Sequence, residues 1–242
     1  MINTESTSAY RDHVARLEEQ LGHDDALRQA IGGEFLAVGR LEYHLLRSLG
    51  LADGHLVVDV GCGSGRLACQ LAPFPGLDYI GCDVVPALVD YATRLSQRPD
   101  WRFAVTDGIG IPCPDAAADY LCFFSVFTHL LHESTFKYFQ ESARCLKPGG
   151  RLVFSFIEFR IPCHWDIFQS SLDHTEAGRH LNQFIDRDAI QTWAAHAKLE
   201  VVSIHDGDQP HIPIPEDICW ENGNRMTSMG NLGQSVAILR RP

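Results

Sequence analysis

The sequence of 242 residues lacks the short motifs that identify several large classes of protein. Its eight cysteines form no C-x-x-C pair, so the ligand spacing of a zinc ribbon and the redox motif of a thioredoxin are both missing. No Gly-Lys-Ser/Thr run is present, which excludes a P-loop for nucleoside triphosphates. No stretch approaches the ~20 apolar residues of a membrane span. Residues 1–20 are polar and do not resemble a signal peptide.

Positive charge is also scarce, since 20 Lys and Arg face 31 Asp and Glu and the formal net charge is −11. Nucleic acids and anionic membranes are bound through clustered Lys and Arg, so this balance disfavours both as partners. Hydrophobic residues make up 45% of the chain, enough for a buried core. Unpaired cysteines within apolar runs fit a reducing compartment, and we expect a cytoplasmic protein. The sequence leaves a homodimer open.

From residue 56 onward, short apolar runs alternate with helical patterns. The alternation predicts βαβ units, a mostly parallel sheet and helices on both faces of it. Strands are expected at 56–60, 78–83, 101–105, 118–124, 151–157, 199–205 and 235–239, and helices at 66–71, 86–95, 133–145 and 186–197. Asp186 is expected to cap the last of these helices.

The remaining segments divide the chain into a lid and a main domain. Residues 1–50 are expected to form an N-terminal helical lid, with helices at 8–21 and 25–49, the second broken near Gly32-Gly33. Residues 51–242 form the α/β domain. Two segments interrupt its alternation, at 158–185 and 207–233, and we expect ordered loops that face a substrate, because long loops in compact domains are often functional.

The strongest motif follows the first predicted strand, where Asp59-Val60-Gly61-Cys62-Gly63-Ser64-Gly65 places glycines at alternate positions. Glycine admits backbone angles and close approaches that a Cβ would block. A ligand can therefore lie against the main chain at the carboxyl end of the strand. The dinucleotide pattern G-x-G-x-x-G needs its third glycine one residue later, where Arg66 stands, so the spacing disfavours a nicotinamide cofactor. A tight strand-to-helix turn without a ligand is the alternative.

Acidic residues follow the next two strands. Asp83 ends the second strand, where a carboxylate can accept hydrogen bonds from both ribose hydroxyls. Asp107-Gly108 follows the third strand, where a carboxylate can receive an adenine amino group. Capping of the following helix is the alternative for Asp83, and an Asx turn is the alternative for Asp107. Two acids and a glycine turn suit a nucleoside attached to an amino acid better than a polyphosphate.

These segments resemble the class I methyltransferases that depend on S-adenosylmethionine (SAM). The glycine turn is similar to their motif I, and Leu146-Lys147-Pro148-Gly149-Gly150-Arg151-Leu152 is similar to their segment before strand five. The resemblance spans roughly residues 35 to 160. It implies a Rossmann-like α/β three-layer sandwich, with a seven-stranded, mostly parallel sheet and an antiparallel last strand.

The resemblance also implies roles for individual residues in binding SAM. The turn of Gly61, Cys62, Gly63 and Gly65 would line the methionine side, and Asp59 would orient the amino group through water. Asp83 would hold the ribose and Val84 would pack on the adenine, whose edge Asp107 and Gly108 would recognise. Phe124 and Ser125 would lie near the transferable methyl. Arg40, in the lead-in Gly33–Arg40, would meet the SAM carboxylate, although a surface or salt-bridge role is its alternative.

Methyl transfer from a sulfonium is an in-line displacement that needs no metal ion, and we expect none. The protein mainly aligns the acceptor and excludes water. An alcohol acceptor benefits from a general base. His129 is the first candidate because its segment directly follows the fourth strand, and Glu158 is the second. A structural or solvated role is the alternative for each.

The sequence therefore predicts a SAM-dependent methyltransferase that acts on a small-molecule acceptor, with a hydroxyl of a sugar or secondary metabolite as the expected target. A nucleic-acid or protein methyltransferase is the second interpretation. It would require a basic rim, for which only Arg144, Lys147, Arg151 and Arg160 are candidates. A non-catalytic SAM-binding or nucleoside-binding module is the third.

Overall fold

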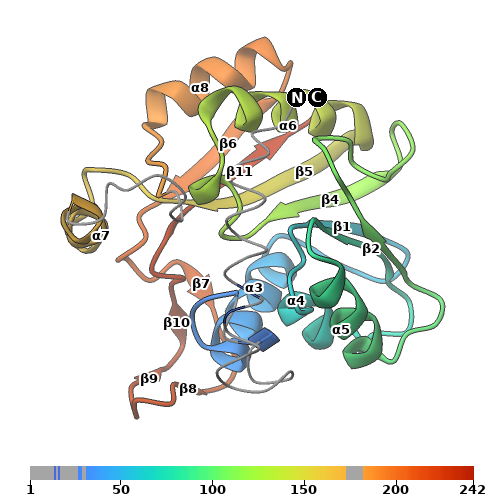
Figure 1. Cartoon of the computed structure of the whole chain (residues 1–242), viewed down its shortest axis with the longest axis horizontal. Helices are drawn as coiled ribbons and strands as arrows, with labels where there is room; N and C mark the ends of the chain where they lie inside the picture. Colours follow the sequence, from blue (N-terminus) through green and yellow to red (C-terminus); the bar gives the residue numbers. More distant parts are fainter. Residues whose placement is uncertain (1–13, 15, 17–26, 29–30, 173–181) are drawn as a thin grey trace.

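In the computed structural model, the residues described are 14, 16, 27–28, 31–172 and 182–242. Seven strands form one sheet in the order β3-β2-β1-β4-β5-β11-β6 (Figure 1). Its parallel part consists of β1 (Leu56–Val60), β2 (Asp78–Asp83), β3 (Arg102–Val105), β4 (Ala118–Phe123) and β5 (Leu146–Phe156). The last strand, β11 (Ser235–Arg240), runs antiparallel to both β5 and β6 (Glu200–His205). The predicted sheet and its antiparallel last strand are confirmed.

Helices cover both faces of the sheet and complete the predicted three layers (Figure 1). One face carries α3 (Phe35–Ser48), α4 (Arg66–Leu71) and α5 (Pro86–Ser96), and the other carries α6 (His132–Cys145) and α8 (Arg187–His196). Neighbouring residues of β1 belong to two different hydrophobic clusters. Val57 lies in the cluster that contains Leu41 of α3, and Val58 lies in the cluster that contains Phe139 of α6. Alternate side chains of a strand point to opposite faces, so two buried faces require the continuous apolar run of β1.

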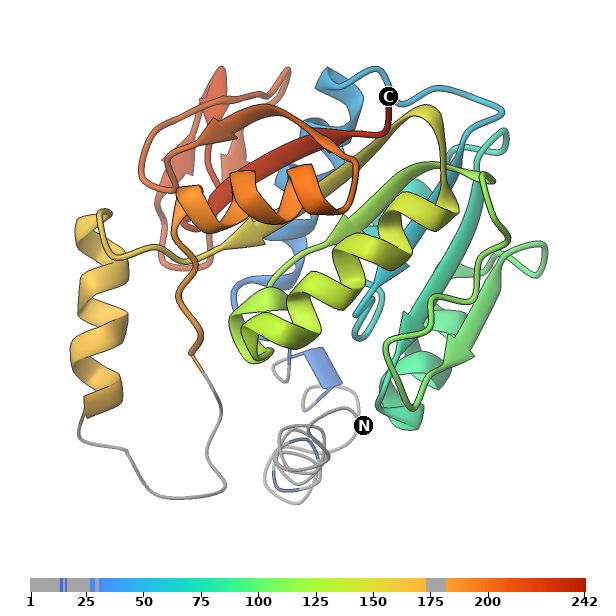
Figure 2. The ribbon, with the colours of Figure 1, turned by 90° about the horizontal axis from the view of Figure 1, so that it is seen from above.

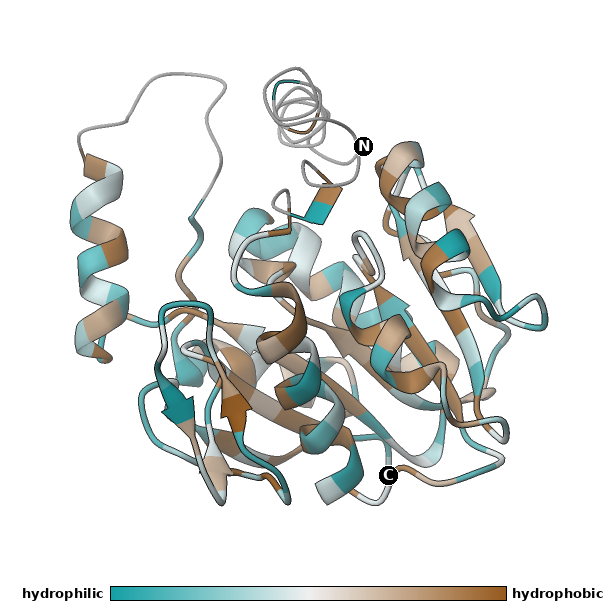
Figure 3. Ribbon diagram, turned by 90° about the horizontal axis from the view of Figure 1, so that it is seen from below, coloured by the Kyte–Doolittle hydropathy of each residue, from teal (hydrophilic) through white to brown (hydrophobic). Residues whose placement is uncertain are grey.

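Hydrophobic residues concentrate along the central strands, whereas the helices alternate between hydrophobic and hydrophilic residues (Figure 3). The largest fully buried side chains include Phe123, Phe127, Phe139 and Phe154. Burying one such side chain contributes about 1.5–3 kcal/mol. These contacts hold the carboxyl ends of the parallel strands in fixed relative positions.

Two local predictions differ from the structure. The strand expected from residue 151 begins at Leu146, directly after α6. Leu146 pairs with Ala118 of β4, and Gly149 and Gly150 exchange backbone hydrogen bonds with Arg241, just beyond β11. Asp186 stands at the N-cap position of α8, but its side chain makes no capping hydrogen bond there, so the predicted cap is wrong.

The two interruptions of the alternation contain short elements. The first carries α7 (Pro162–Leu172), which stands off the main body (Figure 2). The second forms two antiparallel pairs, β7 (Ile212–Pro213) with β10 (Met229–Gly230) and β8 (Ile218–Cys219) with β9 (Arg225–Met226). The helix predicted at 8–21 lies outside the described residues, apart from Val14 and Arg16. Within the described part of the chain, no helix has the length and hydropathy needed to cross a bilayer.

Candidate functional site

A cavity of about 450 Å³ lies along the carboxyl ends of the parallel strands. Its walls come from the glycine turn after β1, from Asp83 and Val84 at the end of β2, and from Phe124–Val126 after β4. Further lining residues come from segments 158–185 and 207–233, the two interruptions of the strand–helix alternation. The volume falls within the ~300–1,000 Å³ of small-molecule sites, and open α/β sheets bind ligands at this edge.

The glycine turn opens its main chain toward this cavity. Gly61 and Gly63 have φ of 73° and 52°, in the left-handed region that favours glycine. A Cβ on Gly61 would lie 2.4 Å from Val126 Cγ2, and one on Gly63 would lie 2.5 Å from Ile31 Cγ2. Gly65 serves another purpose, because it lies outside the lining and a Cβ there would lie 3.0 Å from the Ala92 backbone of α5.

Asp83 fixes the turn against β2. Its Oδ2 accepts a hydrogen bond from the Gly63 N–H at 3.0 Å, and its Oδ1 accepts one from the Val85 N–H at 2.9 Å. Cys82 adds to this link, since its carbonyl accepts the N–H groups of Gly61 and Cys62 at 2.7 and 3.0 Å. Asp83 thus places a buried carboxylate on the wall of the cavity, at the end of β2.

Asp59 is a second buried acid on the cavity wall, with 3% of its surface exposed. Tyr79 of β2 donates its phenol hydrogen to Asp59 Oδ2 over 2.7 Å. Burial raises the pKa of Asp59 to about 7, although the Tyr79 hydrogen bond lowers it. The group therefore titrates near neutral pH.

Arg66 ties the turn to the preceding segment. Its Nε and Nη2 donate to Glu42 Oε1 at 3.0 and 2.6 Å, and its Nη1 donates to the Gly32 carbonyl at 2.9 Å. Burial raises the pKa of Glu42, which the Arg66 charge opposes. Where a dinucleotide site would have glycine, this chain uses an arginine to join α4 to α3.

The structure does not bring Arg40 to the cavity lining. Val38 and Glu42 of the same helix do line it. They stand four residues apart, on one face of α3. Arg40 lies two residues from each, about 200° around the helix axis. The guanidinium at the cavity is that of Arg66.

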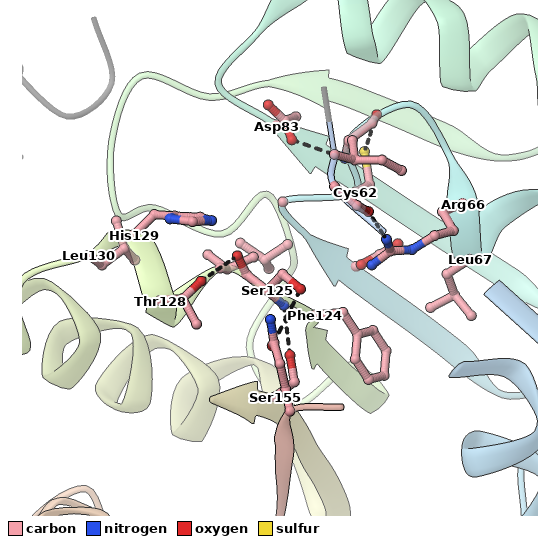
Figure 4. Close-up of a pocket in the computed structure, with 18 of the residues that line it drawn as sticks. Cys62, Arg66, Leu67, Asp83, Phe124, Ser125, Thr128, His129, Leu130 and Ser155 are labelled. Atoms are coloured by element: carbon pink, nitrogen blue, oxygen red, sulfur yellow. Dashed lines mark hydrogen bonds between the residues drawn. The ribbon is translucent and has the colours of Figure 1, made fainter. Parts of the chain in front are cut away.

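The segment after β4 forms the floor of the cavity (Figure 4). Ser125 has φ of 59°, uncommon for a residue with a Cβ, and its N–H donates to Ser155 Oγ of β5 at 2.7 Å. Thr128 donates its hydroxyl to the Ser125 carbonyl at 3.0 Å. His129 closes the short helix η1 (Phe127–His129), and its imidazole points toward the cavity (Figure 4).

Three other predicted site residues lie outside the lining. Asp107 is exposed, and Gly108 accepts a hydrogen bond from the Tyr138 hydroxyl at 3.3 Å, while their neighbours Thr106 and Ile109 line the cavity. The Glu158 carboxylate is buried in a salt bridge with Arg187 at 2.7 Å and accepts the Ser235 hydroxyl at 2.5 Å. Because both carboxylate oxygens are engaged there, Glu158 is not placed to act as a general base.

Sequence reasoning missed several lining residues. Ile167, Asn182 and Leu232 come from the two interruptions, which were expected to face a substrate without any residue being singled out. Tyr138 and Gln234 gave no signal, since a helix tyrosine and a loop glutamine have many structural uses.

Part of the sequence matches a known family of methyltransferases. The sequence model of the family Methyltransf_11, a methyltransferase domain, matches residues 58–154. The chain is 29% identical to a malonyl-[acyl-carrier protein] O-methyltransferase of Hahella chejuensis over 59% of this chain and 50% of that protein. It is 25% identical to the 27-O-demethylrifamycin SV methyltransferase of Amycolatopsis mediterranei over 72% of this chain and 64% of that one. The matches thus span no more than two thirds of either relative.

Solved structures share the fold over nearly the whole chain. One is a chain of the complex between the Haloferax volcanii Trm112 methyltransferase activator and a methyltransferase, with a TM-score of 0.64, 19% identity and coverage of 96% of this chain and 97% of that one. Another is magnesium protoporphyrin IX methyltransferase from Synechocystis with bound S-adenosylhomocysteine (SAH), with a TM-score of 0.60, 15% identity and coverage of 96% and 94%.

Proposed function

We propose that this chain is a class I SAM-dependent methyltransferase, because residues 58–154 match a methyltransferase domain and nearly the whole chain shares the fold of such enzymes. We further propose that it transfers the methyl group of SAM to a hydroxyl oxygen of a small-molecule acceptor. One observation carries the proposal. A single cavity joins the glycine turn and Asp83 to residues of both interruptions, so a cofactor and an acceptor can meet within it.

The residues at the β1 and β2 end fit SAM. Gly61 and Gly63 leave the main chain uncovered for the methionine portion, and the Asp83 carboxylate on the cavity wall is the type of group that accepts hydrogen bonds from ribose hydroxyls. Val84 and Ile109 offer apolar surface for adenine. The cavity's guanidinium, that of Arg66, is bonded to Glu42, so it does not favour a polyphosphate.

Bound SAM supplies a methyl group already activated by the sulfonium charge. The chain's own contribution is then to orient the acceptor and exclude water, which can account for several kcal/mol of the barrier. Ser125 and Phe124 would bound the transfer path from the β4 side. His129 would accept the hydroxyl proton of the acceptor, a role typically worth ~10²–10⁴-fold in rate.

A small-molecule acceptor is favoured over a nucleic acid by the position of the basic residues. Lys147 and Arg151 belong to the first half of β5, whereas the cavity lies at the carboxyl ends of the parallel strands. Lys147 also forms an ion pair with Asp119 at 2.7 Å. Arg144 pairs with Glu141 and Asp115. Arg160, the fourth candidate, is exposed and lies near Asp206. The four basic residues therefore form no continuous rim around the cavity within the described residues. The curated relatives named above carry the names of acyl-carrier-protein and rifamycin methyltransferases.

The proposal is tested by combining SAH calorimetry with an acceptor library read by SAH release. We expect SAH to bind and at least one hydroxyl compound to release SAH from SAM. Binding without turnover of any small molecule, nucleic acid or peptide would instead indicate a non-catalytic SAM-binding module. Turnover of oligonucleotides or peptides alone would contradict the small-molecule acceptor.

A further inference from the structure

Among the described residues, the carboxylate and guanidinium side chains that line the cavity lie at one end of it. Glu42, Asp59, Arg66 and Asp83 belong to α3, β1, α4 and β2. The other end, formed by β5, α7 and the approach to β11, has uncharged lining residues among those described: Ser155, Ile157, Ile167, Asn182, Leu232 and Gln234. The sheet order separates the two groups, because β4 lies between β1 and β5.

The carboxylate of Glu158, which adjoins the lining residue Ile157, is not among the groups that line this end. Glu158 follows Ile157 directly, yet only 1% of its surface is exposed. Its oxygens accept hydrogen bonds from Arg187 and from Ser235. Among the described lining residues of this end, a charged acceptor group would thus lose its water without meeting an opposite charge, which is costly.

Gln234 provides hydrogen-bonding capacity at this end. Its Oε1 accepts the Ser125 hydroxyl over 3.4 Å, which orients the amide. Within the described residues, its Nε2 donates to no protein acceptor. Ser155 Oγ already accepts the Ser125 N–H, so its own hydroxyl hydrogen is available to donate. The groups offered here are neutral donors.

The backbone on both sides of Gln234 is held by buried polar contacts. His164 of α7 has none of its surface exposed, and its Nε2 donates to the Gly233 carbonyl at 2.9 Å. Its Nδ1 accepts the Glu158 N–H at 3.1 Å. On the other side, the Ser235 hydroxyl donates to Glu158 Oε1. These contacts hold the backbone on both sides of Gln234 in place, which a residue that selects a ligand requires.

We propose that Gln234 determines acceptor specificity, and that it selects an uncharged acceptor with an oxygen that accepts a hydrogen bond from its Nε2. This inference rests on the proposed methyltransferase function. The apolar residues Ile157, Ile167 and Leu232 contact the carbon skeleton of the acceptor. The side-chain amide of Gln234 donates a hydrogen bond to one acceptor oxygen close to the methylated hydroxyl. Acceptors bearing a carboxylate or phosphate at this end are rejected.

The test uses the full chain and a library of uncharged alcohols and phenols, each paired with a carboxylate or phosphate derivative of the same skeleton. SAH release is measured for the native protein and for Gln234→Leu, Gln234→Glu and the control Gln140→Glu, exposed on α6. SAH affinity is measured for all four by calorimetry. We expect turnover of uncharged members, a loss of about 3–10-fold in kcat/KM for Gln234→Leu from one neutral hydrogen bond, and a larger loss for Gln234→Glu. SAH affinity and the control should stay within twofold.

The inference is overturned if charged members are the better acceptors, or if both Gln234 variants keep the native kcat/KM while SAH binds normally. Absence of SAH binding, or of turnover with every member, contradicts the proposed function itself, and the inference falls with it. A Gln234 variant that loses SAH affinity in parallel with kcat/KM also contradicts a role confined to the acceptor.

Discussion

The Tyr79 hydroxyl donates a hydrogen bond of 2.7 Å to Asp59 Oδ2, and both residues are buried between neighbouring parallel strands. The contact stabilises the Asp59 carboxylate, but burial has the larger effect and raises its pKa to about 7. Asp59, which titrates near neutral pH, thus lies beside the glycine turn, where the amino group of the methionine portion of SAM would bind.

Binding of SAH should therefore release a proton near pH 7. The cationic amino group favours the ionised form of Asp59, so the acid loses its proton as the ligand binds. Calorimetry in two buffers with different ionisation enthalpies should give different apparent binding enthalpies. Asp59→Asn should make the two values equal, while equal values for the native protein would contradict this assignment.

The same pKa makes a prediction about stability without ligand. Because the folded-state pKa of Asp59 lies above its ordinary value near 3.8, the folded protein holds this proton more tightly than the unfolded chain. The contribution of Asp59 to the free energy of unfolding should be fully present below pH 4 and decline as pH rises toward 7. Urea unfolding of the native protein and Asp59→Asn should diverge across that window, and parallel profiles would refute the prediction.

Breaking the buried ion pair between Glu42 and Arg66 should destabilise the fold. Glu42→Gln leaves the Arg66 guanidinium buried without a carboxylate, at a cost of about 3 kcal/mol. Arg66→Met with Glu42→Leu should recover part of this loss, because an apolar pair replaces the ionic one. Denaturant unfolding of Glu42→Leu, Arg66→Met and the double variant measures the coupling between the two residues, and full additivity of these two changes would show that the residues do not act as a pair.

The glycine turn can be tested against a glycine of similar conformation elsewhere. Gly61 and Gly149 have φ of 73° and 81°, but a Cβ would meet Val126 at the first and nothing within 4 Å at the second. Gly149→Ala should cost only about 1–2 kcal/mol of backbone strain. Gly61→Ala should cost more and weaken SAH binding, and equal losses of stability with unchanged SAH affinity would argue against a site at this turn.

His129→Gln should separate catalysis from cofactor binding. If His129 accepts the proton of a hydroxyl, its loss should lower kcat by about 10²–10⁴-fold and leave SAH affinity nearly unchanged. The pH dependence of kcat should also lose the limb that belongs to the imidazole. Unaltered kcat and pH profile would assign His129 a structural role.

The sequence predicts most of the fold because the signals that specify it are local. The apolar run of Leu56–Val60 must be buried on both faces, and Pro86 can begin a helix without losing a hydrogen bond. Gly61, Gly63 and Asp83 could be located for the same reason, since a strand end and a turn with positive φ leave a clear mark in a sequence.

The rest of the site depends on contacts between distant residues. Glu158 looks free in the sequence, but Arg187, 29 residues later, occupies its carboxylate. The sequence singles out Arg40 as a ligand, but Arg66 lines the cavity instead, because the packing of α3 on α4 decides which side chain reaches it. Gln234 acquires its setting from His164 and Glu158, a relationship that no local pattern encodes.

SAH titration of the native protein, Asp83→Asn and the matched control Asp78→Asn measures the central claim most directly. Asp83 ends β2 at the cavity, whereas Asp78 begins the same strand and is exposed. The account predicts that the native protein and Asp78→Asn bind SAH alike and that Asp83→Asn binds at least about tenfold more weakly, because charge-assisted hydrogen bonds are worth about 1.5–3 kcal/mol. No heat of association with the native protein, or equal affinities for all three proteins, would contradict it.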